Sequence, residues 1–167
     1  FNPGQKKYWR DIASPALSQG VAIVPYGREQ FVAGVRAGGR GDVTDTARLW
    51  EKRGIGSDGA TPVAHDGKAY LVNYKGRVWC LALADGKELW SATLPSGKGV
   101  FYSSPVLVGD TIYCCREEGA VYVGHVTPTG LEILNETRFD EVFVASPILV
   151  QGRLLLRGEK SLICVGH

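Results

Sequence analysis

The chain has 167 residues, 44% of them apolar and 10% aromatic, which is enough to build a packed core and argues against disorder. Its 19 Lys and Arg residues against 17 Asp and Glu residues leave a net charge of +2 without any basic block, which argues against a nucleic-acid-binding protein. The longest uncharged apolar runs are only as long as strands, far short of the roughly 20 residues of a membrane-spanning helix. Glycine is abundant at 22 residues and no helical periodicity persists, so an all-β fold is predicted.

A repeat runs through the chain, and each of its four copies opens with a hydroxyl residue followed by proline. The pairs are Ser14-Pro15, Thr61-Pro62, Ser104-Pro105 and Ser146-Pro147. Successive prolines are 47, 43 and 42 residues apart. A period of about 40 to 50 residues, with several short strands in each copy, is typical of propeller blades. We therefore expect one partial propeller domain over residues 1–167, with repeats at about 11–50, 58–92, 101–137 and 143–167.

Each copy is predicted to form a meander of short strands. The second strand carries an apolar residue eight positions after the proline, namely Ile23, Tyr70, Tyr113 or Leu155. The third strands, near residues 31–35, 78–83, 121–126 and 162–165, are apolar at nearly every position, so both of their faces should be covered. A fourth, outer strand ends in Trp50, in Trp90 and, in the third copy, in Leu134. A large side chain at this point should cap the seam between neighbouring blades.

The fourth copy stops after three strands. Residues 5–10 include Trp9 and precede the first Ser-Pro pair, so we predict that they supply the missing outer strand and close the last blade. The sequence contains no methionine and its first residues resemble the middle of a longer segment, so we expect a processed or truncated chain.

Residues 82–90 read ALADGKELW, which is a third strand, an Asp-Gly turn and a terminal tryptophan. With the Ser-Pro openings, this stretch resembles the repeat signature of the bacterial PQQ-like (quinoprotein-type) β-propellers, and the chain resembles the C-terminal half of such a protein. The resemblance implies four-stranded antiparallel blades in a seven- or eight-bladed ring and a periplasmic or otherwise extracytoplasmic location. The structural repeat positions are Pro15, Pro62, Pro105, Pro147, Trp9, Trp50 and Trp90.

Four blades are few for a single ring, and three arrangements are open. The chain could be half of a longer propeller, it could pair with a second copy into an eight-bladed homodimeric ring, or it could close alone on four blades.

The cysteines do not indicate a disulfide bond or a metal site. Cys114 and Cys115 resemble the vicinal disulfide of PQQ-dependent alcohol dehydrogenases, but they lie within a predicted strand, where adjacent side chains point to opposite faces. We therefore expect buried free thiols. The sequence has no CxxC motif and three isolated histidines, so we expect no metal ligands.

The candidate binding residues gather where the inner strands begin. Four positions before each proline come Asp11, Asp58, Phe101 and Phe143. The loops between second and third strands face the same way and contribute Arg28, Lys75, Arg77, Arg116, Glu118 and Lys160. We expect a ring of charged loops around two aromatic side chains that lean into solvent, which suits a partner or a polar ligand. The alternative is that the phenylalanines plug the channel and the charges are ordinary surface charges.

Two functions compete. The first is a non-catalytic scaffold that binds a protein or polymer at the channel face, with no catalytic residue and no cofactor. The second, which the resemblance implies, is part of a quinoprotein dehydrogenase with PQQ and calcium in the channel and an Asp as base. The first is favoured because the family's cofactor-binding Glu, Asn and Asp residues cannot be placed on any motif of this chain.

Overall fold

The computed structural model describes residues 11–166, and these form four antiparallel sheets that follow one another along the chain. Blade 1 consists of β1 (Ala16–Ser18), β2 (Val21–Tyr26), β3 (Phe31–Arg36) and β4 (Arg48–Arg53). Blade 2 consists of β5 (Val63–His65), β6 (Lys68–Val72), β7 (Arg77–Ala82) and β8 (Glu88–Thr93). Blade 3 consists of β9 (Val106–Val108), β10 (Thr111–Cys115), β11 (Ala120–Val126) and β12 (Leu131–Arg138). Blade 4 consists of β13 (Ile148–Val150), β14 (Arg153–Arg157) and β15 (Leu162–Val165).

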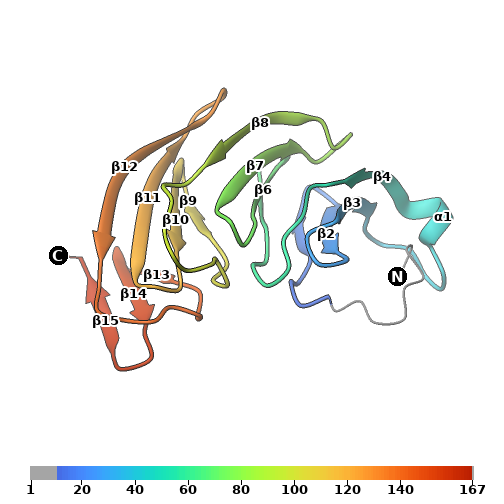
Figure 1. Ribbon diagram of the computed structural model, residues 1–167. Coiled ribbons are helices and arrows are strands. Elements are labelled where there is room, and N and C mark those ends of the chain that lie inside the picture. The colour runs from blue at the N-terminus through green and yellow to red at the C-terminus, as the bar shows by residue number, and fades with distance from the viewer. Residues whose placement is uncertain (1–10, 167) are drawn as a thin grey trace.

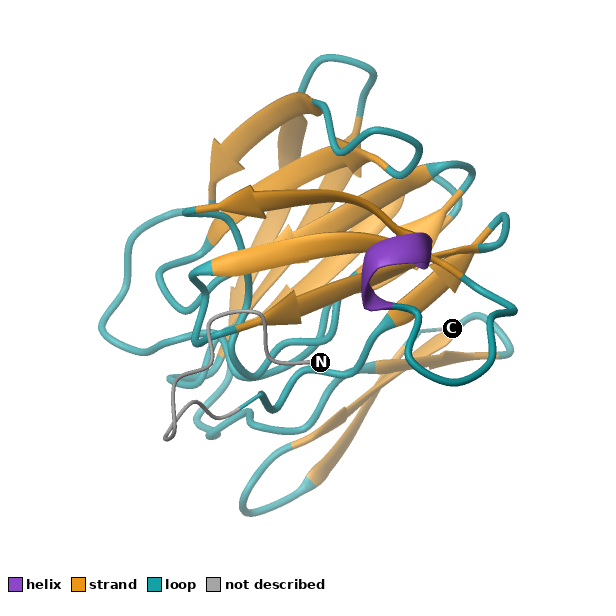
Figure 2. Ribbon diagram, turned by 90° about the vertical axis from the view of Figure 1, so that its right-hand side faces the viewer, coloured by secondary structure: helices purple, strands orange, loops and turns teal. Residues whose placement is uncertain are grey.

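The sheets are arranged as an arc, with blade 1 at one end and blade 4 at the other (Figure 1). Each strand pairs with the next strand in the chain, so each blade is a meander. The one helix of the described residues, α1 (Thr44–Ala47), is a single turn in the long connection between β3 and β4 (Figure 2). No helix in this part of the chain is long and apolar enough to cross a membrane.

The strand register confirms how the repeats align. Ile23 lies opposite Gly34, Tyr70 opposite Cys80, Tyr113 opposite Val123 and Leu155 opposite Cys164. In the three complete blades a bulge between the third and outer strands follows directly after this position. In the first two blades the residue opposite this position on the outer strand is tryptophan. In the third blade Asn135 lies there, opposite Val123, so the prediction of Leu134 as the equivalent residue is wrong by one position.

Tight turns explain why the first two strands of a blade pair. In blade 2, Asp66 and Gly67 have φ angles of 47° and 70°, and the Gln-Gly turns of blades 1 and 4 also have positive φ at both residues. Two consecutive left-handed residues give a hairpin turn whose twist matches that of the strands.

The apolar core lies between the blades. One buried cluster joins blades 1 and 2, a second joins blades 2 and 3, and a third joins blades 3 and 4. In β7, Val78 and Cys80 face blade 3, while Trp79 and Leu81 face blade 1, and all four are at most 5% exposed. The prediction that third strands are covered on both faces is therefore confirmed for this blade.

The hydroxyl residues before the prolines link each blade to the next. Ser14 N–H donates to Thr61 Oγ1 at 3.1 Å, Thr61 N–H to Ser104 Oγ at 2.9 Å, and Ser104 N–H to Ser146 Oγ at 2.9 Å. We call this series the hydroxyl ladder. It explains why a small hydroxyl residue recurs at this position, since the side chain accepts a backbone hydrogen bond from the preceding blade.

The tryptophans cap the seams, as predicted. Trp50 Nε1–H donates to Leu83 O at 2.7 Å, and Trp90 Nε1–H donates to Thr127 O at 3.1 Å, so each indole reaches the next blade. The Trp50 ring fits because Gly34 and Gly86 lack a Cβ, which would lie within 2.5 Å of ring atoms.

The arc is open. Within the described part of the chain no hydrogen bond and no buried cluster joins blade 1 to blade 4, so the four blades do not close on themselves. The predicted closing strand at residues 5–10, with Trp9, lies outside the described residues.

Candidate functional site

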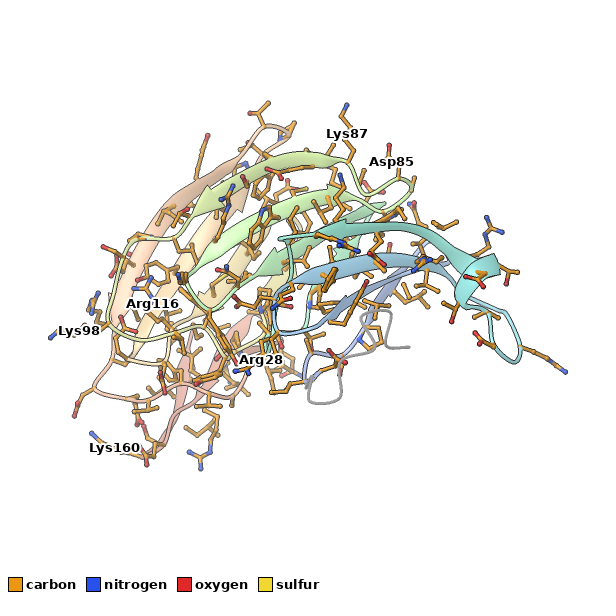
Figure 3. The ribbon with its side chains drawn as sticks, turned by 45° about the vertical axis from the view of Figure 1, so that its right-hand side comes forward. Arg28, Asp85, Lys87, Lys98, Arg116 and Lys160 are labelled. Carbon is orange, nitrogen blue, oxygen red and sulfur yellow. The ribbon has the colours of Figure 1, made fainter. Side chains whose placement is uncertain are left out.

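One side of the arc collects the loops between second and third strands and the segments that lead into the inner strands. Figure 3 shows Arg28, Lys98 and Lys160 on this side, which we call the mouth, and Asp85 and Lys87 on the opposite side. The backbone bonds confirm that loops and lead-in segments meet, since Phe101 N–H donates to Tyr74 O and Phe143 N–H to Glu117 O.

The acidic residues of blades 1 and 2 hold the mouth loops in place. Asp11 Oδ1 accepts a hydrogen bond from Gly27 N–H at 2.6 Å, and Glu29 Oε1 accepts one from Tyr74 N–H at 2.5 Å. Asp58 is only 3% exposed, and its Oδ2 accepts the hydroxyl proton of Tyr74 at 2.9 Å. Burial raises the pKa of Glu29, although the Tyr74 N–H opposes this shift. Glu29 therefore connects the mouth loops of neighbouring blades, while Asp11 and Asp58 each hold the mouth loop of their own blade.

Arg116 is buried, contrary to the expectation of a solvent-facing loop charge. It is 2% exposed, and its guanidinium carbon lies 4.7 Å from the ring centre of Phe101 and 5.2 Å from that of Tyr122. Its Nη1 is 3.3 Å from Glu118 Oε1, and its Nη2 donates to Pro95 O. The arginine fills the seam between blades 2 and 3, where cation–π contacts with two rings replace part of its hydration.

The two phenylalanines do not lean into solvent, so that expectation is wrong. Phe101 and Phe143 are each 1% exposed. Phe101 belongs to the core between blades 2 and 3, and Phe143 to the core between blades 3 and 4, where it meets Phe139 edge to face at 5.9 Å. The lead-in segment crosses the seam between two blades, so an aromatic residue there enters the seam. The alternative of a channel plug is also wrong.

In blade 4 a carboxylate again holds a mouth loop. Glu141 accepts hydrogen bonds from Lys160 N–H at 2.9 Å and from the Ser161 hydroxyl. The hydroxyl bond is the main cause that lowers the pKa of Glu141, followed by the backbone bond. Lys160 itself forms an exposed ion pair with Asp140 at 3.0 Å.

Replacing Glu141 with glutamine should reduce the dependence of stability on pH. Since the folded-state pKa of Glu141 is lowered, its contribution is complete above the ordinary value of 4.5 and is lost as the pH falls through the folded pKa. Urea unfolding of Glu141→Gln and of the unaltered protein should therefore give free energies that differ at pH 7 and converge toward pH 3. Glu159→Gln is the control, because in the described residues that carboxylate makes no hydrogen bond. A difference that persists unchanged at low pH would contradict the assignment.

The exposed residues of the mouth include cations and apolar side chains besides the carboxylates of Asp11, Asp140 and Glu159. Arg28, Lys75 and Arg77 are exposed, as expected, and so is Lys98. The sequence prediction missed Tyr102, Val142 and Val144, which are 37%, 38% and 57% exposed. An open pocket of about 390 Å³ is lined by Val142, Val144, Ala145, Arg157, Gly158 and Glu159. Tyr102, Val142 and Val144 could have been found in the sequence, because each is next to Phe101 or Phe143. In an extended segment the neighbours of a buried residue point to the opposite side.

The cysteines are free, and Cys114 and Cys115 face opposite ways. Cys114 packs between blades 2 and 3 and Cys115 between blades 3 and 4. Burial raises the pKa of the Cys115 thiol to about 12, and it also raises the pKa of Cys114. Neither thiol is therefore a ready nucleophile. In the described residues no group of three His, Cys, Asp or Glu side chains could hold a metal ion.

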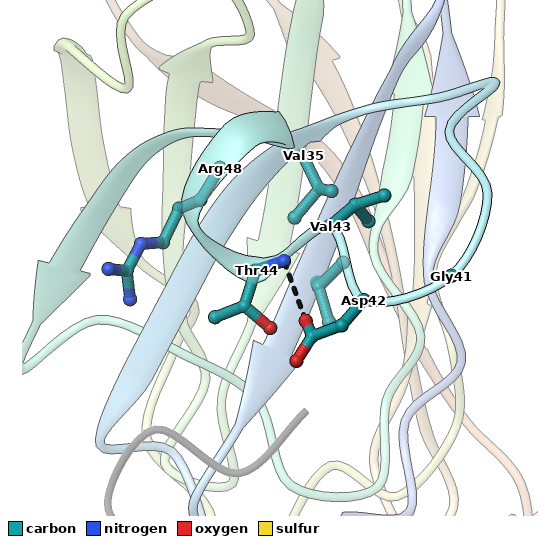
Figure 4. Close-up of a pocket in the computed structure, with 7 residues that line it drawn as sticks. Val35, Gly41, Asp42, Val43, Thr44 and Arg48 are labelled. Atoms are coloured by element: carbon teal, nitrogen blue, oxygen red, sulfur yellow. Dashed lines mark hydrogen bonds between the residues drawn. The ribbon is translucent and has the colours of Figure 1, made fainter.

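A second open pocket lies away from the mouth, on the face of blade 1 that points away from blade 2 (Figure 4). Its volume is about 600 Å³, and it is lined by Val24, Val35, Gly41, Asp42, Val43, Thr44 and Arg48. Asp42 Oδ1 accepts a hydrogen bond from Thr44 N–H at 3.0 Å, which fixes the turn before α1. The floor of the pocket is thus apolar sheet, and its wall is the long β3–β4 connection.

A family model described as "Outer membrane protein assembly factor BamB" matches residues 9–92, which is half of the chain. The chain belongs to the PQQ-like β-propeller repeat family. No match was found among curated protein sequences.

Solved structures confirm the propeller fold. BamB from Moraxella catarrhalis superposes with a TM-score of 0.70 at 14% identity, over 92% of this chain and 46% of that one. The computationally designed Ika4 protein superposes with a TM-score of 0.72 at 10% identity, over 96% of this chain and 94% of that one. A quinohemoprotein alcohol dehydrogenase, ADHIIG from Pseudomonas putida HK5, gives 0.66 at 13% identity, over 89% and 28%. This propeller chain therefore spans about half the length of BamB.

At these identities the structural matches establish the fold and no more. The neighbours include a dehydrogenase as well as BamB, so the propeller family by itself does not decide between a scaffold and an enzyme. The residues of the site must decide.

Proposed function

We propose that the chain is a non-catalytic propeller scaffold whose mouth binds a protein partner. The observation that carries the proposal is how the mouth charges are used. Four of its carboxylates, those of Asp11, Glu29, Glu118 and Glu141, hold the protein's own backbone N–H groups, while cationic and apolar side chains stay exposed.

Four carboxylates of the mouth are occupied by local hydrogen bonds. Asp11, Glu29 and Glu141 accept backbone N–H groups, and Glu118 accepts Gly99 N–H at 3.1 Å besides pairing with Arg116. A carboxylate used in this way is a poor candidate for a catalytic base or a calcium ligand. Their use in local bonds therefore supports the scaffold over the PQQ and calcium alternative.

The exposed side chains suit a protein partner with acidic and apolar residues. Arg28, Lys75 and Lys98 are exposed cations, and Tyr102 is half-covered by Tyr74, with ring centres 5.2 Å apart. Such a mixture of an aromatic anchor with surrounding charge is typical of protein interfaces. Blade 4 differs, because its Lys160 is neutralised by Asp140.

An extracytoplasmic location belongs to the same proposal. The matching family model is described as an outer membrane protein assembly factor, which supports a location outside the cytoplasm. The free and buried thiols of Cys114 and Cys115 are compatible with it, because burial protects them from oxidation.

Site-specific photo-cross-linking in the source cell tests the proposal. A photoreactive amino acid at Tyr102 should give an adduct of one defined mass, and the same amino acid at Leu89 should not. Leu89 is the matched control, because it is 39% exposed but lies on the outer strand of blade 2. Lys75→Glu should reduce the Tyr102 adduct, whereas Lys87→Glu, on the side opposite the mouth, should not.

Two results would overturn the proposal. One is equal cross-linking from Tyr102 and Leu89. The other is a stoichiometric complex with added PQQ in the presence of calcium, followed by absorbance, which would favour the dehydrogenase.

A further inference from the structure

One repeat position in the mouth loops carries a cation in blades 1, 2 and 4 and a carboxylate in blade 3. It lies five residues after the apolar residue that aligns the second strands, and its occupants are Arg28, Lys75, Glu118 and Lys160. Lys160 is paired with Asp140. Arg28 and Lys75 are exposed and form no ion pair within the described residues. Blades 1 and 2 therefore each present one exposed, unpaired cation.

In blade 3 the side chain of Glu118 holds the loop of residues 95–99, which leads from β8 into this blade. Glu118 Oε2 accepts Gly99 N–H at 3.1 Å, and its Oε1 lies 3.3 Å from Arg116 Nη1. Arg116 Nη2 in turn donates to Pro95 O, at the start of the same loop. The buried ion pair thus fastens both ends of the loop to the mouth loop of blade 3.

The fastened loop presents Lys98. A Cβ at Gly97 would lie 1.8 Å from Arg116 Nη1, and one at Gly99 would lie 2.4 Å from Glu118 Oε2. The loop therefore passes too close to the ion pair for a side chain at either glycine. Lys98, between them, is exposed at the mouth and forms no ion pair within the described residues (Figure 3). Blade 3 thus shows a cation that its own mouth loop lacks.

A fixed aromatic pair accompanies these cations. The ring of Tyr74, next to Lys75, meets that of Tyr102 edge to face, with ring centres 5.2 Å apart. Asp58 accepts the Tyr74 hydroxyl at 2.9 Å and Glu29 accepts its N–H at 2.5 Å, so this residue is held from two sides. Tyr102 is 37% exposed. The mouth therefore combines one exposed cation for each of three blades with an aromatic surface that is held in place.

We propose that Arg28, Lys75 and Lys98, here called the cation row, bind an extended acidic segment of the partner protein that has an acidic residue at every third position. Neighbouring sheets pack roughly 10 Å apart. A polyproline II helix has three residues per turn and a rise of about 3.1 Å per residue, so side chains three residues apart project from one side about 9 Å apart. Segments in this conformation also dock on aromatic side chains. The inference rests on the proposed function, because it uses the same mouth, and it adds the chemistry of the partner.

The distribution of charge favours a protein segment over an anionic membrane surface. Lipid-binding surfaces typically gather about 4–8 Lys or Arg residues in one cluster. The cation row instead supplies one cation for each blade, and the net charge of the chain is only +2. Cations held at separate blades select carboxylates with a matching spacing.

Two synthetic peptides of the same composition test the spacing by NMR titration of the purified protein. In the first, three glutamates stand at every third position and each is followed by proline, which favours polyproline II. In the second, the three glutamates are adjacent. The first peptide should bind roughly tenfold more tightly, since each of its two additional ion pairs contributes about 2- to 5-fold. Equal affinities, or tighter binding of the second peptide, would overturn the proposal.

Lysine variants locate the binding site of the spaced peptide. Lys75→Ala and Lys98→Ala should each raise its dissociation constant by about 2- to 5-fold. Lys160→Ala is the matched control, because this mouth lysine is already paired with Asp140 and should leave the constant unchanged. The titrations are made at about 0.1 M salt, where charges more than about 10 Å apart are largely screened. Unchanged affinity in Lys98→Ala, or equal losses in all three variants, would contradict the cation row.

Glu118 is a positioning residue for Lys98, and a double-mutant cycle separates this role from a general loss of stability. Glu118→Ala releases Gly99, so adding Lys98→Ala should then have no further effect on peptide affinity, while adding Lys75→Ala should still weaken binding. Glu118→Gln keeps an acceptor for Gly99 N–H and should retain the dependence on Lys98. An undiminished effect of Lys98→Ala in the Glu118→Ala protein would refute the positioning role.

Vesicles of phosphatidylglycerol and phosphatidylcholine test the membrane alternative. The protein should not sediment with them at about 0.1 M salt, where the surface charge is screened within about 10 Å. Co-sedimentation that is lost in Lys75→Ala and Lys98→Ala would overturn the proposal in favour of a lipid surface. A single adduct at Tyr102 together with equal binding of the two peptides would overturn this inference alone. Preference for the spaced peptide without any adduct at Tyr102 would overturn the proposed function alone.

Discussion

Replacing Phe101 with alanine should lower the free energy of unfolding by about 3–5 kcal/mol, the usual cost of removing a fully buried phenylalanine. The ring is 1% exposed and packs 6.0 Å from the centre of the Tyr122 ring, with Arg116 above it. It also fits tightly against Gly76, where a Cβ would lie 2.6 Å from a ring atom. The cavity left by alanine would open between blades 2 and 3 and would leave the Arg116 guanidinium without one of its two aromatic contacts. Urea unfolding at a fixed protein concentration measures the loss.

Tyr102→Ala is the control for this variant because the two residues are neighbours in the same segment. Tyr102 is 37% exposed and its ring lies on the surface against Tyr74, so its removal should cost less than about 1.5 kcal/mol. The two variants should therefore separate stability from binding: Phe101→Ala mainly destabilises, and Tyr102→Ala mainly weakens the partner complex. If Phe101→Ala left stability unchanged and abolished cross-linking, Phe101 would belong to the mouth surface after all.

The blades could be predicted from the sequence because their determinants are local and repeated. A proline after a hydroxyl residue and an apolar residue eight positions later recur in all four copies, and an outer-strand tryptophan recurs in the first two. The hydroxyl of Thr61 accepts the Ser14 N–H of the preceding blade, and Trp50 reaches the carbonyl of Leu83 in the following blade. Repetition exposes such positions even though the partner of each contact lies 33 to 47 residues away.

The burial of the mouth residues could not be predicted, because residues at equivalent positions of a repeat share a backbone conformation but can differ in how deeply their side chains are buried. Asp11 and Phe143 occupy the same repeat position, but Asp11 is exposed and holds Gly27 N–H, while Phe143 is enclosed between blades. Asp58, at the same repeat position, is a carboxylate like Asp11 but is only 3% exposed and accepts the Tyr74 hydroxyl. The outcome therefore depends on which partners the neighbouring loops supply, and a buried carboxylate needs such a hydrogen-bond donor.

Arg116 shows the same limit for charged residues. A loop arginine is ordinarily solvated, and nothing local in its sequence indicates that Phe101 and Tyr122 would enclose it. The enclosing residues come from the lead-in segment and from β11. Only the way in which blade 2 meets blade 3 brings them together, so this part of the mouth required the structure.

Gly119→Ala should lower the free energy of unfolding by about 3 kcal/mol, because the mutation combines a left-handed backbone with a collision against backbone atoms. Gly119 has a φ angle of 93°, and a Cβ there would lie 2.1 Å from Phe139 O and 2.8 Å from Glu141 O. Neither oxygen can move freely, since Phe139 N–H donates to Gly119 O at 3.0 Å and Glu141 holds the mouth loop of blade 4. The strain therefore spreads from the turn before β11 into the seam between blades 3 and 4, and urea unfolding should show it as a lower midpoint.

Gly109→Ala separates the two causes of this loss. Gly109 also has a positive φ, of 57°, but a Cβ at this position meets no atom within 4 Å, so only the conformational cost of about 1 kcal/mol should remain. The larger loss in Gly119→Ala then measures how closely the lead-in segment of blade 4 is packed on blade 3. That packing places Val142 and Val144 on the mouth surface. Equal losses in the two variants would mean that backbone conformation alone accounts for the effect and that the contact between these blades is loose.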